Sequence, residues 1–184
     1  MSKVRSGNIL LDVDLVLSKM KLKDKMTVAD FGCGTTGFFV FPVAKSVGKN
    51  GKVYAVDILK IALENIKKKA RHENLLSVQV VWSDLEIFGA TEIEAGSVDV
   101  GLLINTLYLS SRKNEILRET TRTLKKGARI IVIDWKDVAI PFGPQPEERI
   151  DKDALIEMSK KNSLSLEEEF SAGEYHFGLI FTKI

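Results

Sequence analysis

The chain has 184 residues, of which 45% are hydrophobic and 28% charged, and its formal net charge is +2. This length suits one domain with a sizeable core, so we treat residues 1–184 as a single domain, and the small net charge argues against a strongly basic nucleic-acid-binding surface. No apolar run reaches membrane-spanning length, the N-terminus lacks a signal-peptide pattern, and the single cysteine, Cys33, excludes an internal disulfide. We therefore expect a cytoplasmic protein that does not act in a membrane.

Apolar and amphipathic segments alternate through the first half of the chain. Their spacing predicts helices over 9–20, 36–47 and 59–73 and strands over 28–31, 53–56 and 78–82. The first helix is expected to pack on the sheet or to cover a bound cofactor. Pro42 should bend the second helix or delay its start. The third helix is basic and amphipathic, with exposed lysines and with four apolar side chains turned inward: Ile61, Ala62, Ile66 and Ala70.

The second half of the chain continues this alternation and then ends on a hairpin. Strands are predicted over 98–104 and 129–134, and helices over 112–125 and 151–162. Two further strands, over 164–170 and 175–182, are joined by the short segment 171–173, which is a hairpin signal. Strands that alternate with helices form parallel sheets. The sequence therefore predicts an α/β fold whose mostly parallel sheet carries an antiparallel strand at or near one edge.

A glycine-rich segment separates the first strand from the next helix. Gly32, Gly34 and Gly37 allow a sharp turn and a close approach of the main chain to a ligand. We expect Gly37 to open the helix, whose free N–H groups attract negative charge. Asp57 ends the second strand 20 residues after Gly37, where a ribose hydroxyl would need an acceptor. The spacing therefore predicts a site for a cofactor that contains adenosine.

Asp30, two residues before the first glycine, distinguishes two such cofactors. A nicotinamide dinucleotide would place a pyrophosphate at the loop, and a carboxylate within about 5 Å would repel it by a few kcal/mol. S-adenosylmethionine (SAM) would place its cationic methionine end there, which a carboxylate attracts. We therefore predict SAM. Two alternatives stay open: a nicotinamide-dependent oxidoreductase, for which the chain has little room for a substrate domain, and a non-catalytic SAM-binding module.

On these residues the chain resembles the class I SAM-dependent methyltransferases, over about residues 8–136 and in outline beyond. The resemblance implies a three-layer Rossmann-like sandwich around a seven-stranded sheet, with Asp84 and Leu85 in the adenine pocket. In the family's loop the third glycine comes one residue earlier, so Thr35-Thr36-Gly37 contains one extra residue. The cofactor-binding residues that the resemblance implies are Asp30, Gly32, Cys33, Gly34, Thr35, Gly37, Asp57, Ile58, Ser83, Asp84, Leu85 and Asn105.

The catalytic residues are harder to name, because methyl transfer needs alignment and exclusion of water more than acid–base groups. Loops that converge on one sheet edge carry four candidates: Asn105, Tyr108, Trp135 and His176. Tyr108 and Trp135 would supply aromatic walls for the sulfonium, and His176 would take a proton. The two histidines and the cysteine lie far apart in the sequence, so we expect no metal site.

The acceptor of the methyl group is predicted by exclusion. The segment Asn105-Thr-Leu-Tyr108 lacks the Asn-Pro-Pro-Tyr pattern of enzymes that methylate exocyclic amines of bases. There is also no strongly basic charge balance, so we expect a small-molecule acceptor. A nucleic acid or protein acceptor and the oligomeric state stay open. Three prolines between 141 and 146 predict a stiff loop at the same edge, either a lid or a plain crossover.

Overall fold

The computed structural model describes residues 10–184, so position 9 of the helix predicted over 9–20 lies outside the described residues. The helices are α1 (Val13–Met20), α2 (Val40–Val47), α3 (Lys60–His72), α4 (Lys113–Thr123) and α5 (Lys152–Lys161), with short 3-10 turns η2 (Leu107–Leu109) and η3 (Pro146–Glu148). The strands are β1 (Thr27–Phe31), β2 (Lys52–Asp57), β3 (Val78–Trp82), β4 (Val98–Ile104), β5 (Leu124–Trp135), β6 (Leu164–Ser171) and β7 (His176–Lys183).

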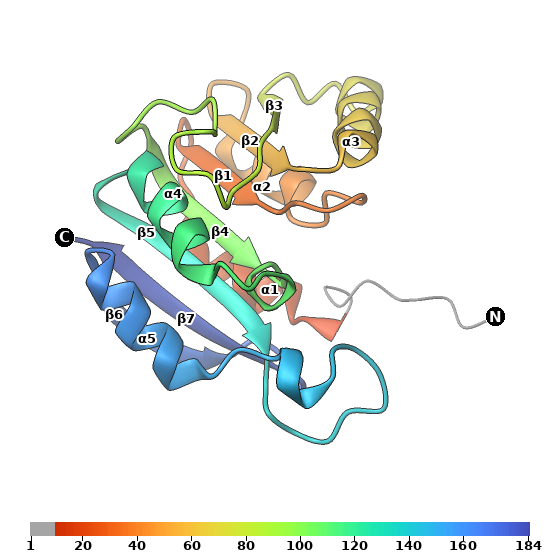
Figure 1. Ribbon diagram of the computed structural model, residues 1–184. Helices are drawn as coiled ribbons and strands as arrows, with labels where there is room; N and C mark the ends of the chain where they lie inside the picture. Colours follow the sequence, from red (N-terminus) through yellow and green to blue (C-terminus); the bar gives the residue numbers. More distant parts are fainter. Residues whose placement is uncertain (1–9) are drawn as a thin grey trace.

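The seven strands form one sheet in the order β3-β2-β1-β4-β5-β7-β6 (Figure 1). The five strands β3, β2, β1, β4 and β5 run parallel to one another. Strand β7 lies between β5 and β6 and is antiparallel to both. The central strand β4 is buried along almost its whole length, as a strand covered on both faces must be. The predicted α/β fold, with a mostly parallel sheet and an antiparallel C-terminal strand, is confirmed.

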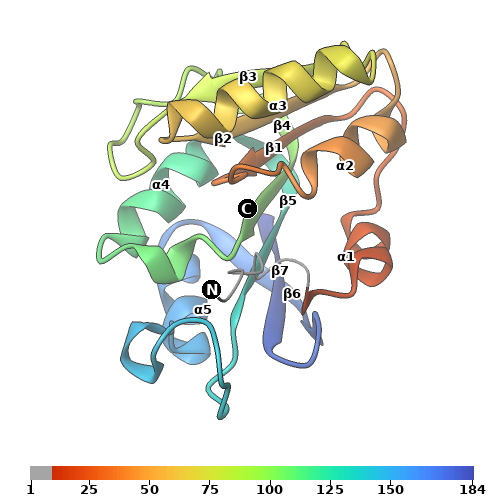
Figure 2. The same ribbon diagram turned by 90° about the vertical axis from the view of Figure 1, so that its right-hand side faces the viewer.

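Helices cover both faces of this sheet and make a three-layer structure. Helices α1, α2 and α3 lie on one face, and α4 and α5 lie on the other (Figure 2). Alternate residues of β5 point to opposite faces of the sheet. Ile131 and Ile133 pack in the core beneath α1, α2 and α3, whereas Ile130 and Val132 pack in the core beneath α4 and α5. No helix among residues 10–184 is both long and apolar enough to cross a bilayer.

Helix α2 begins at Val40, so the prediction that Gly37 opens it is wrong. Residues 32–39 form a turn instead, in which Phe38 and Phe39 pack edge to face with ring centroids 5.3 Å apart. Pro42 is the third residue of the helix, where its missing N–H costs no intrahelical hydrogen bond. The later start that Pro42 predicted is therefore observed.

Two further expectations need correction. Leu124 was expected in the helix over 112–125, but α4 ends at Thr123 and Leu124 begins β5, paired with Val98. Ile61 was expected to face inward, but it is 58% exposed, and Leu63 is buried instead. The buried stripe of α3 runs through positions 62, 66 and 70, and position 63 lies beside it on the helix surface, whereas position 61 lies off the stripe.

Candidate active site

The loop after β1 is fixed by its two neighbouring strands. The N–H groups of Gly32 and Cys33 donate to the carbonyl oxygen of Val56 at 2.8 and 3.0 Å. Thr106, which follows β4, donates through Oγ1 to the carbonyl oxygen of Phe31 at 3.1 Å. A Cβ on Gly32 would lie 2.6 Å from that hydroxyl oxygen, so this position requires glycine. Contacts with β2 and β4 therefore set the shape of the loop.

Gly34 has open space where Gly32 has none. Its φ is +66°, and a Cβ there would meet no atom within 4 Å. Its N–H donates to Oδ2 of Asp57 at 2.8 Å, and the N–H of Leu59 donates to Oδ1 at 2.9 Å. Each carboxylate oxygen can accept a further hydrogen bond. The main chain at Gly34 is thus open to a ligand, and Asp57 keeps the capacity to accept a ribose hydroxyl.

The extra residue of the loop lies on its outer side. Thr35 and Thr36 are exposed, whereas Gly37 is buried. A Cβ on Gly37 would lie 3.0 Å from Ile66 and 3.1 Å from Phe41, so this glycine permits close packing of the loop on α3. The insertion is therefore accommodated in solvent, and the cofactor contacts of Thr35 and Gly37 stay predictions.

The ends of β2 and β3 lie side by side and present apolar surface. Ile58 is 52% exposed, and Trp82 is 53% exposed and donates through Nε1 to the carbonyl oxygen of Ile58 at 2.8 Å. Ser83 and Leu85 are buried, whereas Asp84 is partly exposed and accepts from the N–H of Glu86 at 2.9 Å. An exposed aromatic and aliphatic surface next to a carboxylate suits a flat base with an exocyclic amine.

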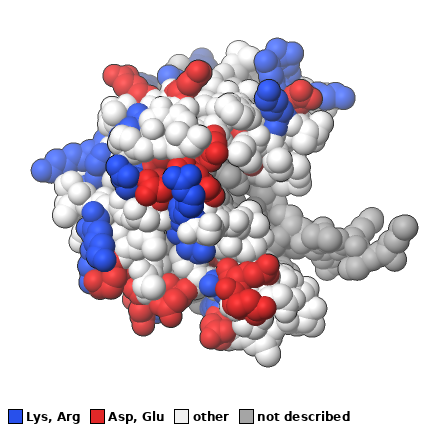
Figure 3. Space-filling model, viewed as in Figure 1, with Lys and Arg blue, Asp and Glu red and all other residues white. Residues whose placement is uncertain are grey.

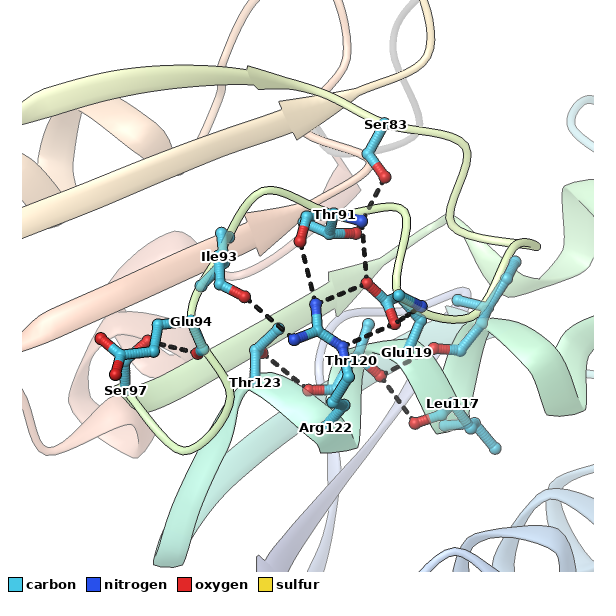
Figure 4. A network of polar contacts seen from close by, with 12 residues as sticks. Ser83, Thr91, Ile93, Glu94, Ser97, Leu117, Glu119, Thr120, Arg122 and Thr123 are labelled. Carbon is cyan, nitrogen blue, oxygen red and sulfur yellow. Dashed lines mark hydrogen bonds and ion pairs between the residues drawn. The ribbon is translucent and has the colours of Figure 1, made fainter.

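A buried ion pair on α4 holds the loop that follows β3 (Figure 4). Glu119, which has no exposed surface, accepts from the N–H groups of Gly89 and Thr91 at 2.7 and 2.9 Å. Arg122 donates to it at 2.9 and 2.8 Å, and the hydroxyls of Thr91 and Ser83 lie 2.8 Å apart. Burial raises the pKa of Glu119, but these hydrogen bonds outweigh it and lower the pKa. The sequence analysis missed this pair; a Glu and an Arg three residues apart on α4 were its only signal.

Two acids, Asp30 and Asp57, lie close to the thiol of Cys33 in the glycine loop. Asp30 is 4% exposed, and its burial, followed by the charge of Asp57, raises its pKa to about 7. Burial, followed by the charges of the two acids, raises the pKa of the Cys33 thiol. Cys33 is therefore a protonated residue packed in the core, while its contact with the cofactor stays a prediction. A cation beside Asp30 would favour its charged form.

The structure brings together three of the four catalytic candidates. Trp135 and His176 stand opposite each other on β5 and β7, and their ring centroids are 4.3 Å apart. Tyr108 meets Trp135 edge to face at 6.4 Å. Asn105 lies one strand away at the end of β4, where its N–H donates to the carbonyl oxygen of Ile133 at 2.8 Å. These contacts make an aromatic corner at the edge that also carries the glycine loop; the chemical roles of its members stay predictions.

Asp134 is a site residue that the sequence analysis missed. It is fully buried, and its carboxylate accepts from the N–H groups of Trp135 at 2.9 Å and of Tyr108 at 3.2 Å. Burial raises its pKa to about 7, although these hydrogen bonds act in the opposite direction. Asp134 thereby ties η2 to the end of β5 and orients the aromatic corner. Its signal was an acid at the end of an apolar strand, the same signal that identified Asp57.

The proline-rich loop packs over this corner. A Cβ on Gly143 would lie 2.9 Å from the Trp135 ring, and Phe142 meets Tyr175 edge to face at 5.2 Å. Arg149 closes the loop by donating to the carbonyl oxygens of Val138 at 2.6 Å and of Pro144 and Lys136 at 3.1 to 3.3 Å. The loop, at the lower right of Figure 1, lines an open cavity of about 460 Å³. The loop thus packs against Trp135, while its role as a lid or as a plain crossover stays a prediction.

A seven-stranded sheet with a glycine loop after β1 and an acid at the end of β2 is typical of the Rossmann-like class of SAM-dependent methyltransferases. Residues 22–174 match the family described as methyltransferase domain, and the chain belongs to that family. The recognition made from the glycine loop and Asp57 is thereby confirmed. The family also decides between the two cofactors in favour of SAM, against a nicotinamide dinucleotide.

Individual relatives agree with this assignment. The crystal structure of a SAM dependent methyltransferase from Aquifex aeolicus is 26% identical with a TM-score of 0.86, over 98% of this chain and 95% of that one. Demethylmenaquinone methyltransferase of Lactococcus lactis subsp. lactis is 29% identical over 143 residues, which are 78% of this chain and 55% of that protein. A ubiquinone/menaquinone biosynthesis C-methyltransferase of Rhizobium johnstonii is 27% identical over 113 residues, which are 59% of this chain and 42% of that protein. The chain spans about half the length of these curated relatives.

Proposed function

We propose that the protein transfers the methyl group of SAM to a small organic molecule bound at the carboxyl ends of β4 and β5. The observation that carries this proposal is the aromatic corner of Tyr108, Trp135 and His176, which lies at the same sheet edge as the glycine loop. The names of the two curated relatives support a small-molecule acceptor. On the face seen in Figure 3, basic and acidic side chains are interspersed, which favours a small molecule over a nucleic acid.

The cofactor loop fits SAM in charge and in shape. Asp30 is a buried acid whose charged form a cation would stabilise, and Gly34 leaves the main chain open. Asp57 would accept from the ribose, and Asp84 from the adenine amine. When bound, SAM supplies a methyl group on a positively charged sulfur. The acids at this site therefore favour the positive charge of SAM over the negative charge of a nicotinamide pyrophosphate.

In the acceptor half of the site, the protein contributes orientation and a hydrogen-bond acceptor. The faces of Tyr108 and Trp135 favour a cation and hold a flat acceptor in place. Burial, followed by the charge of Lys136, lowers the pKa of His176 to about 4. The imidazole is therefore neutral at pH 7, and its lone pair can accept a hydrogen bond from the acceptor, although the low pKa makes it a weak base. Asp134 holds Tyr108 and Trp135 by their main chain.

A labelling experiment tests this function. The protein is incubated with methyl-labelled SAM and with separate small-molecule, RNA and protein fractions of a cell extract. Label should enter the small-molecule fraction, Asp57→Ala should lose most of it, and Asp153→Ala, which changes an exposed acid on α5, should retain it. Label confined to RNA or protein overturns the acceptor class. Binding of SAM without transfer to any fraction supports the non-catalytic alternative instead.

A further inference from the structure

Positive charge is concentrated on helix α3 and the turn that follows it. Residues 60–82 contain five lysines and arginines but only two acids, which gives this segment a formal net charge of +3, whereas the whole chain has +2. On the face seen in Figure 3, lysine and arginine side chains gather at α3, at the upper right. The rest of the chain is therefore slightly acidic, and the basic charge is local.

Three of these cations lie on one flank of α3, which faces the edge of the sheet. Lys60, Lys67 and Arg71 are seven and four residues apart, so they lie within about 40° of one another around the helix. Nζ of Lys60 lies 5.7 Å from the centroid of the Trp82 ring at the end of β3, which is the outermost strand. Within residues 10–184, Lys67 and Arg71 are exposed and form no ion pair, so their charges remain available to a partner.

Large apolar side chains are exposed beside these cations. Leu76, in the turn that joins α3 to β3, is 82% exposed, and Trp82 is half exposed beside Lys60. A lipid bilayer satisfies both kinds of group, because lipid phosphates attract the cations while the bilayer interface accepts leucine and tryptophan. The phosphates of RNA would meet the cations but would leave Leu76 in water. The composition of this surface therefore favours a lipid surface over a nucleic acid.

We propose that this flank binds the surface of an anionic lipid bilayer. The contact surface, which we name the basic flank, consists of Lys60, Lys67, Arg71, Leu76 and Trp82. Negative lipid headgroups supply the charge that complements it. The prediction that the protein does not act in a membrane rested on the lack of a run of spanning length, and binding to a bilayer surface needs no such run. The proposal goes beyond the proposed methyl transfer and does not depend on it.

Vesicle binding tests the basic flank, and Trp82 provides a built-in probe because the other tryptophan, Trp135, is buried. The full chain is mixed with vesicles of phosphatidylcholine alone, or with mixed vesicles of equal parts phosphatidylcholine and phosphatidylglycerol, and the vesicles are sedimented. The protein should sediment with the mixed vesicles only, and added salt should release it. The fluorescence of Trp82 should shift to shorter wavelength as the indole leaves water. Trp82→Phe should remove that shift and still sediment.

Charge-reversal variants locate the contact. Lys67→Glu combined with Arg71→Glu should weaken binding by more than about 25-fold, because each cation near an anionic surface contributes about fivefold. Lys160→Glu combined with Lys161→Glu makes the same change in net charge on α5, which covers the other face of the sheet, and should weaken binding less than about threefold. No binding to mixed vesicles, equal losses in the two double variants, or an unshifted Trp82 fluorescence on binding overturns the proposal. Binding to an RNA oligonucleotide but not to mixed vesicles also overturns it and assigns the basic flank to nucleic acid.

Discussion

Replacing Glu119 with alanine should destabilise the fold by about 3 kcal/mol. Breaking a buried ion pair costs about 3–5 kcal/mol, because the remaining charge loses its partner. The N–H groups of Gly89 and Thr91 would lose their acceptor as well. Arg122 would keep the carbonyl oxygens of Ile93 at 3.0 Å and Thr91 at 2.9 Å, which is why we expect the lower end of the range.

The same helix supplies a matched control. Glu115 and Arg118 have the same spacing and lie 3.0 Å apart, but their side chains are 27% and 47% exposed. Glu115→Ala should therefore cost less than about 1 kcal/mol. Urea denaturation followed by circular dichroism measures both losses. Below the unfolding transition, Glu119→Ala should also bind SAM more weakly, since the loop after β3 loses its anchor. Equal losses of stability in the two variants would refute the buried-anchor reasoning.

Lowering the pH should reproduce part of the loss of stability caused by Glu119→Ala, because it protonates the Glu119 carboxylate. The folded-state pKa of Glu119 is lowered, since hydrogen bonds from Arg122 and from two main-chain N–H groups outweigh its burial. Its contribution to stability is therefore present above the unfolded pKa of about 4.5 and is lost as the pH falls through the folded pKa. Glu119→Gln should remove this part of the acid sensitivity in the same urea assay. An unchanged acid profile in that variant would contradict the assignment.

Three further predictions concern the cofactor loop. Asp57→Ala should weaken SAM binding by about 1.5–3 kcal/mol in calorimetry, and an unchanged affinity would remove Asp57 from the ribose role. Gly34→Ala should cost the free protein about 1–2 kcal/mol of backbone strain, whereas Gly32→Ala should cost more because its Cβ would lie 2.6 Å from Thr106; equal melting temperatures would contradict this. The pKa of Asp30 is about 7, so SAM affinity should rise between about pH 6 and 8, and Asp30→Asn should abolish the dependence. The same shift makes the free protein lose stability from about pH 4 to 7, where only the unfolded carboxyl is ionised.

The strands were predictable because their signals are local. β4 and β5 are apolar runs, and β1 and β2 each approach a glycine or an acid that ends them. Asp57 and the glycine loop were recognised by spacing alone, since both lie within one βαβ unit, β1-α2-β2. Their hydrogen bond at 2.8 Å is the physical counterpart of that spacing.

The missed residues have partners far away in the sequence. Glu119 bonds to N–H groups 28 and 30 residues earlier, and nothing in its local sequence distinguishes it from the partly exposed Glu115. The contact of Trp135 with His176 depends on the register of β5 against β7, which the sequence does not state. The start of α2 was misplaced because Gly37, with φ at +56°, continues the turn rather than the helix. Tertiary packing decided each of these outcomes.

The anchoring of the adenine-side loop by α4 also sets an order of events during synthesis. The glycine loop, Asp57 and Asp84 all leave the ribosome before Glu119 and Arg122 do. A nascent chain that stops short of α4 therefore carries the acids proposed for SAM but lacks the clamp on the loop beside them. We therefore expect full affinity for SAM only after α4 has docked on the loop after β3.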